Sequence, residues 1–528
     1  MPAMSEAASG LARASLILVI GFLGSRALGV LRNMVLAATF GAGAELDAYF
    51  AAFRLPDALF QVIVGAALAS AFIPTFASVL NRGSPEAAWR LASASVNILS
   101  LVGVIGAWAG FVFAPWIVPW TVAFFPPEQQ ALTVDLARVM MLSTAFFCAS
   151  GMITGVLNAR FHFLLPALAP WLYNLSIIAG ALLLHERVGI MGPALGVAVG
   201  AGLHLLVQLP GLALVGMRYR ATFNPRTPGV DEVLRLMGPR VLTLGAAQVS
   251  WLVTTVLASG LAEGSITALT YAWALVMVPV GIFGMAPATA AFPSLAQAVA
   301  QQDWARYRHL LSTGLRRAVF LSVPGSVGLI LLREPLVVLL FERGEFDRAS
   351  TLLTTVVLVF FSVGLFAHVL LEIASRGSYA LHDTRTPLLF ALLGMGAHAV
   401  FSVLLVGLGG AAGLALAMSL STVVEAVGLL VAVARRTGRF DWHALLASSA
   451  KTLAATAAMA GAVALLLSEV PLGMDTASMA ARVGLAAIAG GAVFVAVSAL
   501  LRSDDLSELF AAILVGRGRA KAAQRDGG

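Results

Sequence analysis

The chain of 528 residues is 59% hydrophobic and only 11% charged, with a mean hydropathy of +0.92. Soluble proteins carry about 25% charged residues, so this composition excludes a soluble globular protein. A membrane-spanning helix needs about 20 to 25 residues. Fourteen such helices would use about 350 of the 528 residues, and the short loops that remain would leave no sizeable domain outside the bilayer. The net charge of +7 points to membrane topology and anionic lipid, not to nucleic acid.

Apolar stretches, cut at Pro, Gly and charge clusters, predict an all-α polytopic membrane protein. The first stretch is too long for a signal-peptide core and is interpreted as an uncleaved span. Six spans are expected in residues 11–216, at 11–40, 47–80, 91–114, 131–157, 166–184 and 189–216. Six more are expected in residues 231–434, at 231–262, 265–300, 307–332, 350–381, 386–408 and 411–434. Two extra spans, 444–468 and 479–502, precede a basic cytoplasmic tail at 503–528. The prediction is therefore two six-helix lobes plus two C-terminal helices.

The distribution of basic residues supports this count, because cytoplasmic loops are enriched in Lys and Arg. With the N-terminus placed in the cytoplasm, 24 of the 33 basic residues fall at cytoplasmic ends. Five fall on the opposite side, namely Arg187, Arg333, Arg343, Arg348 and Arg482, and four fall within spans, namely Arg26, Arg32, Arg54 and Arg138. This asymmetry predicts that both termini are cytoplasmic.

A faint internal repeat joins the two expected lobes. Residues 71–77 (AFIPTFA) end the second span and residues 291–296 (AFPSLA) end the eighth, and a Trp-bearing basic stretch follows each. The offset is about 215 to 220 residues, which predicts a parallel repeat around a central cavity, as in transporters that alternate between inward-open and outward-open states.

Charges within the spans indicate where a site lies. An Arg near mid-bilayer costs about 2.5 to 3.5 kcal/mol on insertion scales, so Arg26 and Arg32 need a partner or water. Two interpretations are open for each arginine. In the first, it pairs with a carboxylate or its side chain reaches a membrane interface; in the second, it faces a hydrated cavity and binds an anionic group such as phosphate. In the second span, Asp47, Arg54 and Asp57 lie on neighbouring parts of one face, either as an intrahelical pair or at a kink made by Pro56.

Two acids of the second expected lobe have two interpretations. Glu372 lies one turn after His368, and Glu425 lies well inside the twelfth span. Each is either a protonated core group or a site of cation coupling. The last residues, from Asp505 onward, place apolar side chains at helical spacing before a basic stretch, which predicts a short amphipathic helix on the membrane surface. The sequence contains no Walker loop, no His-Glu-x-x-His motif and no plausible metal cluster, and no cofactor is expected.

Two stretches resemble the MurJ/MviN family of lipid II flippases, of the multidrug/oligosaccharidyl-lipid/polysaccharide exporter superfamily. The first runs through residues 25–32 (SRALGVLR), 40–43 (FGAG), 47–50 (DAYF), 52–56 (AFRLP) and 71–74 (AFIP). The second contains residues 340–346 (LFERGEF), 378–381 (SYAL) and 383–387 (DTRTP). The resemblance implies a cationic central cavity, and two extra helices that form a groove for a lipid tail.

The resemblance also implies that Arg26, Arg32 and Asp47 belong to the cavity. Several positions depart from the family pattern: Phe60 and Gln61 stand where an Arg-Arg pair is typical, Gly65 where a Glu is usual, and Ala274 where a cavity Arg is common. Part of the expected pyrophosphate site is thus missing, so either Arg54 and the remaining arginines suffice or the substrate differs.

The sequence therefore predicts a flippase of the bacterial inner membrane, not an enzyme. It would carry lipid II, the undecaprenyl-pyrophosphate-linked precursor, to the outer leaflet by alternating access. Arg26, Arg32, Asp47 and Arg54 would form the substrate site, and Glu372 and Glu425 would couple a cation. The expected partners are lipid II and membrane lipid, with no nucleic acid, and the chain is expected to be a monomer. The alternatives are an exporter of another lipid-linked oligosaccharide, a cation-coupled drug antiporter, a membrane scaffold or a glycosyl-lipid enzyme.

Overall fold

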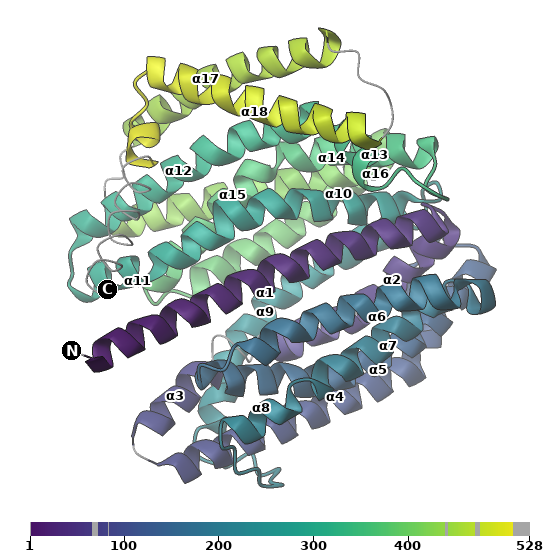
Figure 1. Cartoon of the computed structure of the whole chain (residues 1–528), viewed down its shortest axis with the longest axis vertical. Helices are drawn as coiled ribbons and strands as arrows, with labels where there is room; N and C mark the ends of the chain where they lie inside the picture. Colours follow the sequence, from purple (N-terminus) through teal and green to yellow (C-terminus); the bar gives the residue numbers. More distant parts are fainter. Residues whose placement is uncertain (1, 66–71, 83, 439–441, 470–475, 510–528) are drawn as a thin grey trace. The chain divides into compact units, whose positions relative to one another are not determined.

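The computed structural model describes residues 2–65, 72–82, 84–438, 442–469 and 476–509, and their regular structure is helical (Figure 1). The helices of the first half are α1 (Pro2–Phe40), α2 (Ala44–Phe60), the π-helix η1 (Gln61–Gly65), α3 (Ile73–Asn81), α4 (Pro85–Thr121), α5 (Pro127–Ala159), α6 (Leu164–Val188), α7 (Met191–Leu206), α8 (Leu209–Leu214) and α9 (Val230–Ala258). Those of the second half are α10 (Ser265–Val280), the π-helix η3 (Gly281–Met285), α11 (Ala286–Ala300), α12 (Trp304–Leu331), α13 (Arg333–Leu340), α14 (Arg348–Val363), α15 (Leu365–Ala380), α16 (Arg385–Thr437), α17 (Trp442–Glu469) and α18 (Thr476–Leu500). A short helix over 504–509 follows α18.

Among the described residues, 11 helices are long and apolar enough to cross a membrane, or 12 if the bent pair α14 and α15 is one span. The α2, η1 and α3 segments, which cover the expected second span, are not in that number because residues 66–71 lie outside the described part. The remaining difference from fourteen comes from α16, whose 53 residues count as one helix.

The α16 segment is a helical hairpin. Gly410 has φ of 54° and ψ of −130°, which interrupts the helix. A Cβ on Gly413 would lie 2.1 Å from the Leu405 carbonyl oxygen, and one on Gly394 would lie 2.9 Å from Oε2 of Glu425. Such contacts require the chain to reverse at Gly410, since residues eight apart in a straight helix lie about 12 Å apart. The structure thus agrees with separate spans at 386–408 and 411–434.

The chain divides into two compact units, which are described separately. Unit 1 consists of Met1–Thr267 with Arg343–Asp347, and unit 2 of Ala268–Glu342 with Arg348–Gly528. In unit 1, α6 and α7 pack so closely that a Cβ on Gly180 would lie 2.4 Å from the Gly192 carbonyl oxygen. Small residues permit this backbone approach between membrane helices. Helix α1 packs on α6, where Nε1 of Trp171 donates to the Gly21 carbonyl at 3.0 Å.

Three turns of unit 1 meet through glycines with positive φ. Gly41 (φ 65°) follows α1, Gly264 (φ 84°) precedes α10, and Gly344 (φ 59°) lies in the 343–347 segment. A Cβ on Gly344 would lie 2.1 Å from the Ala38 carbonyl oxygen, and the Glu345 amide donates to the same oxygen at 3.0 Å. Only glycine allows both this backbone conformation and this approach. Two of the stretches that carry the family resemblance therefore touch each other, although about 300 residues separate them.

The two π-helices begin 220 residues apart, at Gln61 and Gly281. Each follows a helix that contains a proline, Pro56 in α2 and Pro279 in α10. Proline removes an intrahelical hydrogen bond, and π segments mark breaks of helical register. This spacing equals the upper value of the expected repeat offset and supports an internal repeat.

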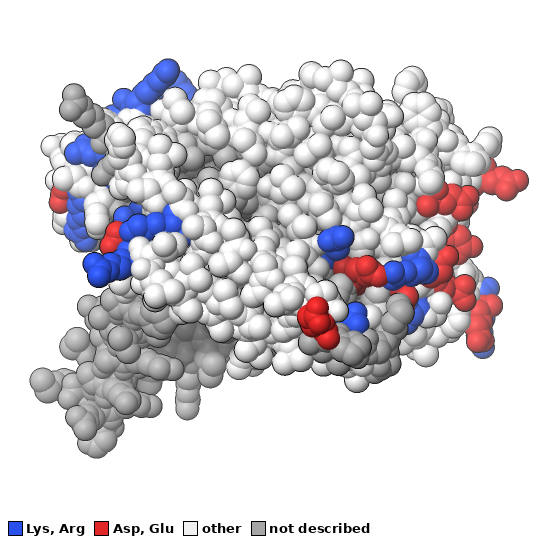
Figure 2. Space-filling view, turned by 90° about the horizontal axis from the view of Figure 1, so that it is seen from above, with Lys and Arg blue, Asp and Glu red and all other residues white. Residues whose placement is uncertain are grey.

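Charged side chains gather in two regions of the face shown in Figure 2. Lys and Arg predominate toward the left, Asp and Glu lie among further Lys and Arg toward the right, and mostly uncharged atoms lie between. Asp383, in the turn between α15 and α16, pairs with Arg436. Burial opposes ionisation of the Asp383 carboxyl. Hydrogen bonds from the Thr386 side chain and amide, the Arg436 charge and the Arg385 amide outweigh burial and lower the pKa of Asp383.

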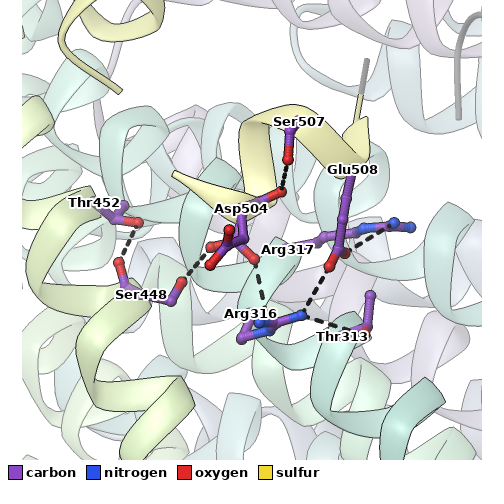
Figure 3. A network of polar contacts seen from close by, with 9 residues as sticks. Thr313, Arg316, Arg317, Ser448, Thr452, Asp504, Ser507 and Glu508 are labelled. Atoms are coloured by element: carbon purple, nitrogen blue, oxygen red, sulfur yellow. Dashed lines mark hydrogen bonds and ion pairs between the residues drawn. The ribbon is translucent and has the colours of Figure 1, made fainter. Parts of the chain in front are cut away.

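The residues after α18 fold back onto unit 2 (Figure 3). Asp505 is 1% exposed, accepts a hydrogen bond from Ser448 of α17, and forms an ion pair with Arg316 of α12 at 3.7 Å. Glu508 contacts Arg316 at 3.1 Å and Arg317 at 3.3 Å. Leu506 joins an apolar core of unit 2. The expected surface helix is therefore corrected in its first part: residues 504–509 pack against protein, because two carboxylates find arginines there. The residues from 510 onward lie outside the described part.

The difference in burial between the two carboxylates generates a prediction. Asp505→Ala should lower the free energy of unfolding by about 2 kcal/mol, because it leaves the half-buried Arg316 without one of its two carboxylates and Ser448 without its acceptor. Glu508→Gln should cost less than about 1 kcal/mol, since this pair is more exposed. Apparent melting temperatures in detergent would show the order, and equal shifts for both variants would contradict it.

Candidate functional site

Helix α1 carries two arginines within its membrane span. Cζ of Arg26 lies 5.3 Å from the Phe22 ring centroid. Nη2 of Arg32 donates to Oδ1 of Asn33 at 3.1 Å, and its Nε donates to the same oxygen at 3.3 Å. Among the described residues, neither arginine forms an ion pair with a carboxylate. The aromatic and amide contacts hold the two side chains but leave the positive charges uncompensated.

Helix α2 contributes a third arginine, Arg54. Its Cζ lies 4.2 Å from the ring centroid of Trp251, which comes from α9. Asp57, one turn further along α2, interacts with it electrostatically. The sequence did not indicate this aromatic partner from α9.

Asp47 lies at the start of α2 and is 2% exposed. Its Oδ1 accepts from the Thr267 amide at 2.7 Å and from the Thr267 hydroxyl at 2.6 Å, and its Oδ2 accepts from the Gly264 amide at 2.8 Å. These donors belong to the first turn of α10 and to the residue just before it. The carboxylate therefore caps a helix that begins more than 200 residues later, and its acceptors are already in use.

Phe60, one of the positions that depart from the family pattern, makes apolar contacts, and Val64 and Trp273 lie next to two others, Gly65 and Ala274. Phe60 packs on Phe147 of α5 at a centroid distance of 5.3 Å. Val64, in η1, packs against Gly151 of α5. A Cβ on Gly151 would lie 2.3 Å from Cγ1 of Val64. Ala274 follows Trp273, whose ring lies 5.1 Å from that of His368. Aromatic packing thus occupies the Phe60 position, where the family pattern has a charge.

A buried polar cluster of unit 1 was not anticipated. Nδ1 of His204 lies 2.6 Å from Oγ of Ser150, Gln208 donates to that oxygen at 2.7 Å, and Thr154 donates to Gln208 at 2.8 Å. No motif marks this cluster in the sequence, because its partners come from α5, from α7 and from the turn that follows α7. The only sequence signal was the presence of His and Gln one turn apart in an apolar stretch.

The two candidate coupling acids lie in unit 2. Glu372 packs beside Gly284 of η3, and Glu425 beside Gly394 in the other half of the α16 hairpin. One turn before them, Nε2 of His368 and the Thr422 hydroxyl lie 3.5 Å apart. This contact joins the two helices close to both acids.

Arg138, the fourth arginine expected within a span, behaves differently. It pairs with Asp135 on its own helix at 3.9 Å and stacks over Phe111. It therefore has a carboxylate partner, which neither Arg26 nor Arg32 has within the described part of the chain. In the part of the chain that the structure describes, no group of three or more His, Cys, Asp or Glu residues is arranged to hold a metal ion.

Comparison with known proteins identifies the family. The family model described as "Lipid II flippase MurJ" matches residues 36–483. A protein named "Lipid II flippase MurJ" from Burkholderia cenocepacia is 32% identical over 431 residues, which cover 80% of this chain and 84% of that protein. A "Probable lipid II flippase MurJ" from Rhizobium tropici is 30% identical over 458 residues, 85% of each chain.

Solved structures share the fold. A lipid II flippase MurJ in an inward closed conformation matches with a TM-score of 0.78 at 24% identity, covering 93% of this chain and 99% of that one. An inward-facing multidrug resistance MATE transporter of the MOP superfamily matches with a TM-score of 0.68 at 16% identity, over 80% of this chain and 98% of that one. With the family match spanning most of its length, this multi-pass inner-membrane protein belongs to the lipid II flippase MurJ family.

Proposed function

We propose that this protein is a transporter, not an enzyme, that carries lipid II from the cytoplasmic to the outer leaflet by alternating access. The relatives named above are lipid II flippases. Exporters that share the fold occur in inward-facing and outward-facing conformations, which supports a rocking mechanism. The proposal includes two six-helix lobes, at 11–216 and 231–434, two extra transmembrane helices at 444–502 and a basic tail at 503–528. It also includes cytoplasmic termini and a monomeric state.

The observation that carries the proposal is the set of arginines in α1 and α2. Arg26 and Arg32 have no carboxylate partner among the described residues, whereas Arg138 has one. A guanidinium group offers several N–H donors in one plane, which suits the oxygens of a pyrophosphate. Arg26, Arg32 and Arg54 would neutralise the pyrophosphate while the lipid tail stays in the bilayer.

A second substrate class has a specific observation in its favour. Phe60 packs against Phe147, and neither Phe60 nor Gln61 carries the positive charge that the family pattern implies, so fewer cationic groups are available to a substrate. Another lipid-linked oligosaccharide, with fewer negative charges, would match this arrangement. Complementation of a flippase-depleted bacterium distinguishes the two: failure of a well-inserted protein to restore growth would favour the other substrate.

Neutral variants of the three arginines test the proposal. Arg26→Gln, Arg32→Gln and Arg54→Gln should each weaken lipid II binding by about 10- to 100-fold, because a hydrogen bond to a charged group contributes about 1.5 to 3 kcal/mol. Arg138→Gln is the matched control and should bind like the wild type. Unchanged growth of cells that depend on an Arg26→Gln, Arg32→Gln double variant would rule the arginine site out.

Asp47 belongs to the proposed site as a positioning residue. Asp47→Ala should lower the free energy of unfolding by about 2 to 4 kcal/mol, because three donors at the start of α10 lose their acceptor. Asp47→Asn retains one acceptor oxygen and should cost less. Melting temperature and lipid II affinity should fall together; a variant that melts like the wild type but binds lipid II poorly would instead make Asp47 a substrate contact.

We further propose that cation coupling acts through Glu372 or Glu425. Replacing the coupling acid by Gln should leave lipid II binding intact but make transport insensitive to an imposed proton or Na⁺ gradient. Glu263→Gln, at an exposed turn, is the control. Transport that responds normally to both gradients in the Glu372→Gln, Glu425→Gln double variant would contradict this assignment.

A further inference from the structure

The contact between Arg54 and Trp251 joins two helices that are far apart in the sequence. Arg54 belongs to α2 and Trp251 to α9, and the guanidinium carbon lies 4.2 Å from the indole centroid, over the ring. Both residues belong to unit 1. Trp251 itself is held on α9, where its carbonyl accepts from the Thr255 hydroxyl at 2.9 Å. This bond belongs to the backbone turn of α9 from which the indole projects, and the arginine lies over the indole ring.

An aromatic face holds an arginine differently from a carboxylate. The ring quadrupole attracts the cation but does not remove its charge. The N–H donors of guanidinium lie in its own plane, so contact through its face does not use the directions along which it would bind phosphate oxygens. An unrestrained arginine side chain has about 2 kcal/mol of rotamer entropy to lose on binding. Stacking removes part of that freedom before a substrate arrives.

We propose that Trp251 is a positioning residue for substrate binding: its indole face orients the Arg54 guanidinium so that its N–H groups meet the pyrophosphate. This inference rests on the proposed function, because it takes Arg54 as a substrate-binding residue. The proposal gives α9 a role in the site, although neither the composition nor the motifs of the sequence pointed to a site residue in this helix.

The test is a double-mutant cycle with lipid II as the probe. Full-length wild type, Arg54→Gln, Trp251→Leu and the double variant are compared for lipid II affinity in detergent. Trp251→Leu should weaken binding roughly 3- to 30-fold, the range expected for a cation–π contact that ranges from exposed to desolvated. In the Arg54→Gln background the same change should have less than about a twofold effect, since the group that it positions is gone.

Two further variants separate positioning from packing. Trp251→Phe keeps an aromatic face and should retain affinity between those of the wild type and Trp251→Leu. Trp89→Leu is the matched control, because Trp89 also carries an arginine over its ring in unit 1, Arg160 at 5.7 Å, and lies outside the proposed site. It should lower the melting temperature at least as much as Trp251→Leu and leave lipid II affinity within twofold of the wild type.

The outcomes distinguish this inference from the proposed function. If Arg54→Gln binds lipid II as tightly as the wild type, Arg54 is not a substrate residue and that part of the proposed function fails. If Arg54→Gln binds weakly but the loss from Trp251→Leu is the same with and without Arg54, the positioning role is overturned while the arginine site stands. Equal affinities of Trp251→Phe and Trp251→Leu would also overturn it.

Discussion

The cost of an ionised side chain in hydrocarbon is the constraint on which this structure depends. The chain meets it in several ways. Asp47 is surrounded by three donors at the start of α10, and Arg138 takes an acid from its own helix. Arg54 lies over an indole. Arg26 and Arg32 have aromatic or amide contacts but no carboxylate partner among the described residues, which is why we propose them as the substrate site.

Features set by short stretches of sequence were predictable. Hydropathy located the helices, and the break at 408–411 was placed correctly because glycines interrupt an otherwise unbroken apolar run. The intramembrane arginines were recognised for the same reason: a charge within a long apolar segment is conspicuous without knowledge of its neighbours. The glycine motifs were also visible, although their reason, close backbone approach with positive φ at Gly41 and Gly344, required coordinates.

Features made by distant segments were not predictable. Nothing near Asp47 in the sequence indicates that its acceptors serve Gly264 and Thr267. Trp251 looks like any aromatic residue of a membrane helix until Arg54 lies beside it. The C-terminal segment shows the same limit, because its spacing suggested a helix on the bilayer surface whereas Asp505 finds Arg316 and becomes buried. Each case depends on a contact between residues that are far apart in the sequence, and the local pattern of residues in a single sequence does not specify such contacts.

The reversal at Gly410 has a consequence for how the protein enters the membrane during synthesis. A tight turn joins the two halves of α16. No polar loop between them could therefore remain on one side of the bilayer while the second half is inserted separately. Basic residues stand only at the two ends of the pair, Arg385 at the start and Arg435 and Arg436 at the finish, and none lies between. With the cytoplasmic termini that we propose, both ends of the pair lie on the side of synthesis, which agrees with the resistance of basic residues to translocation. On that proposal the hairpin inserts as a single unit, and its turn is the only part of it that crosses the bilayer.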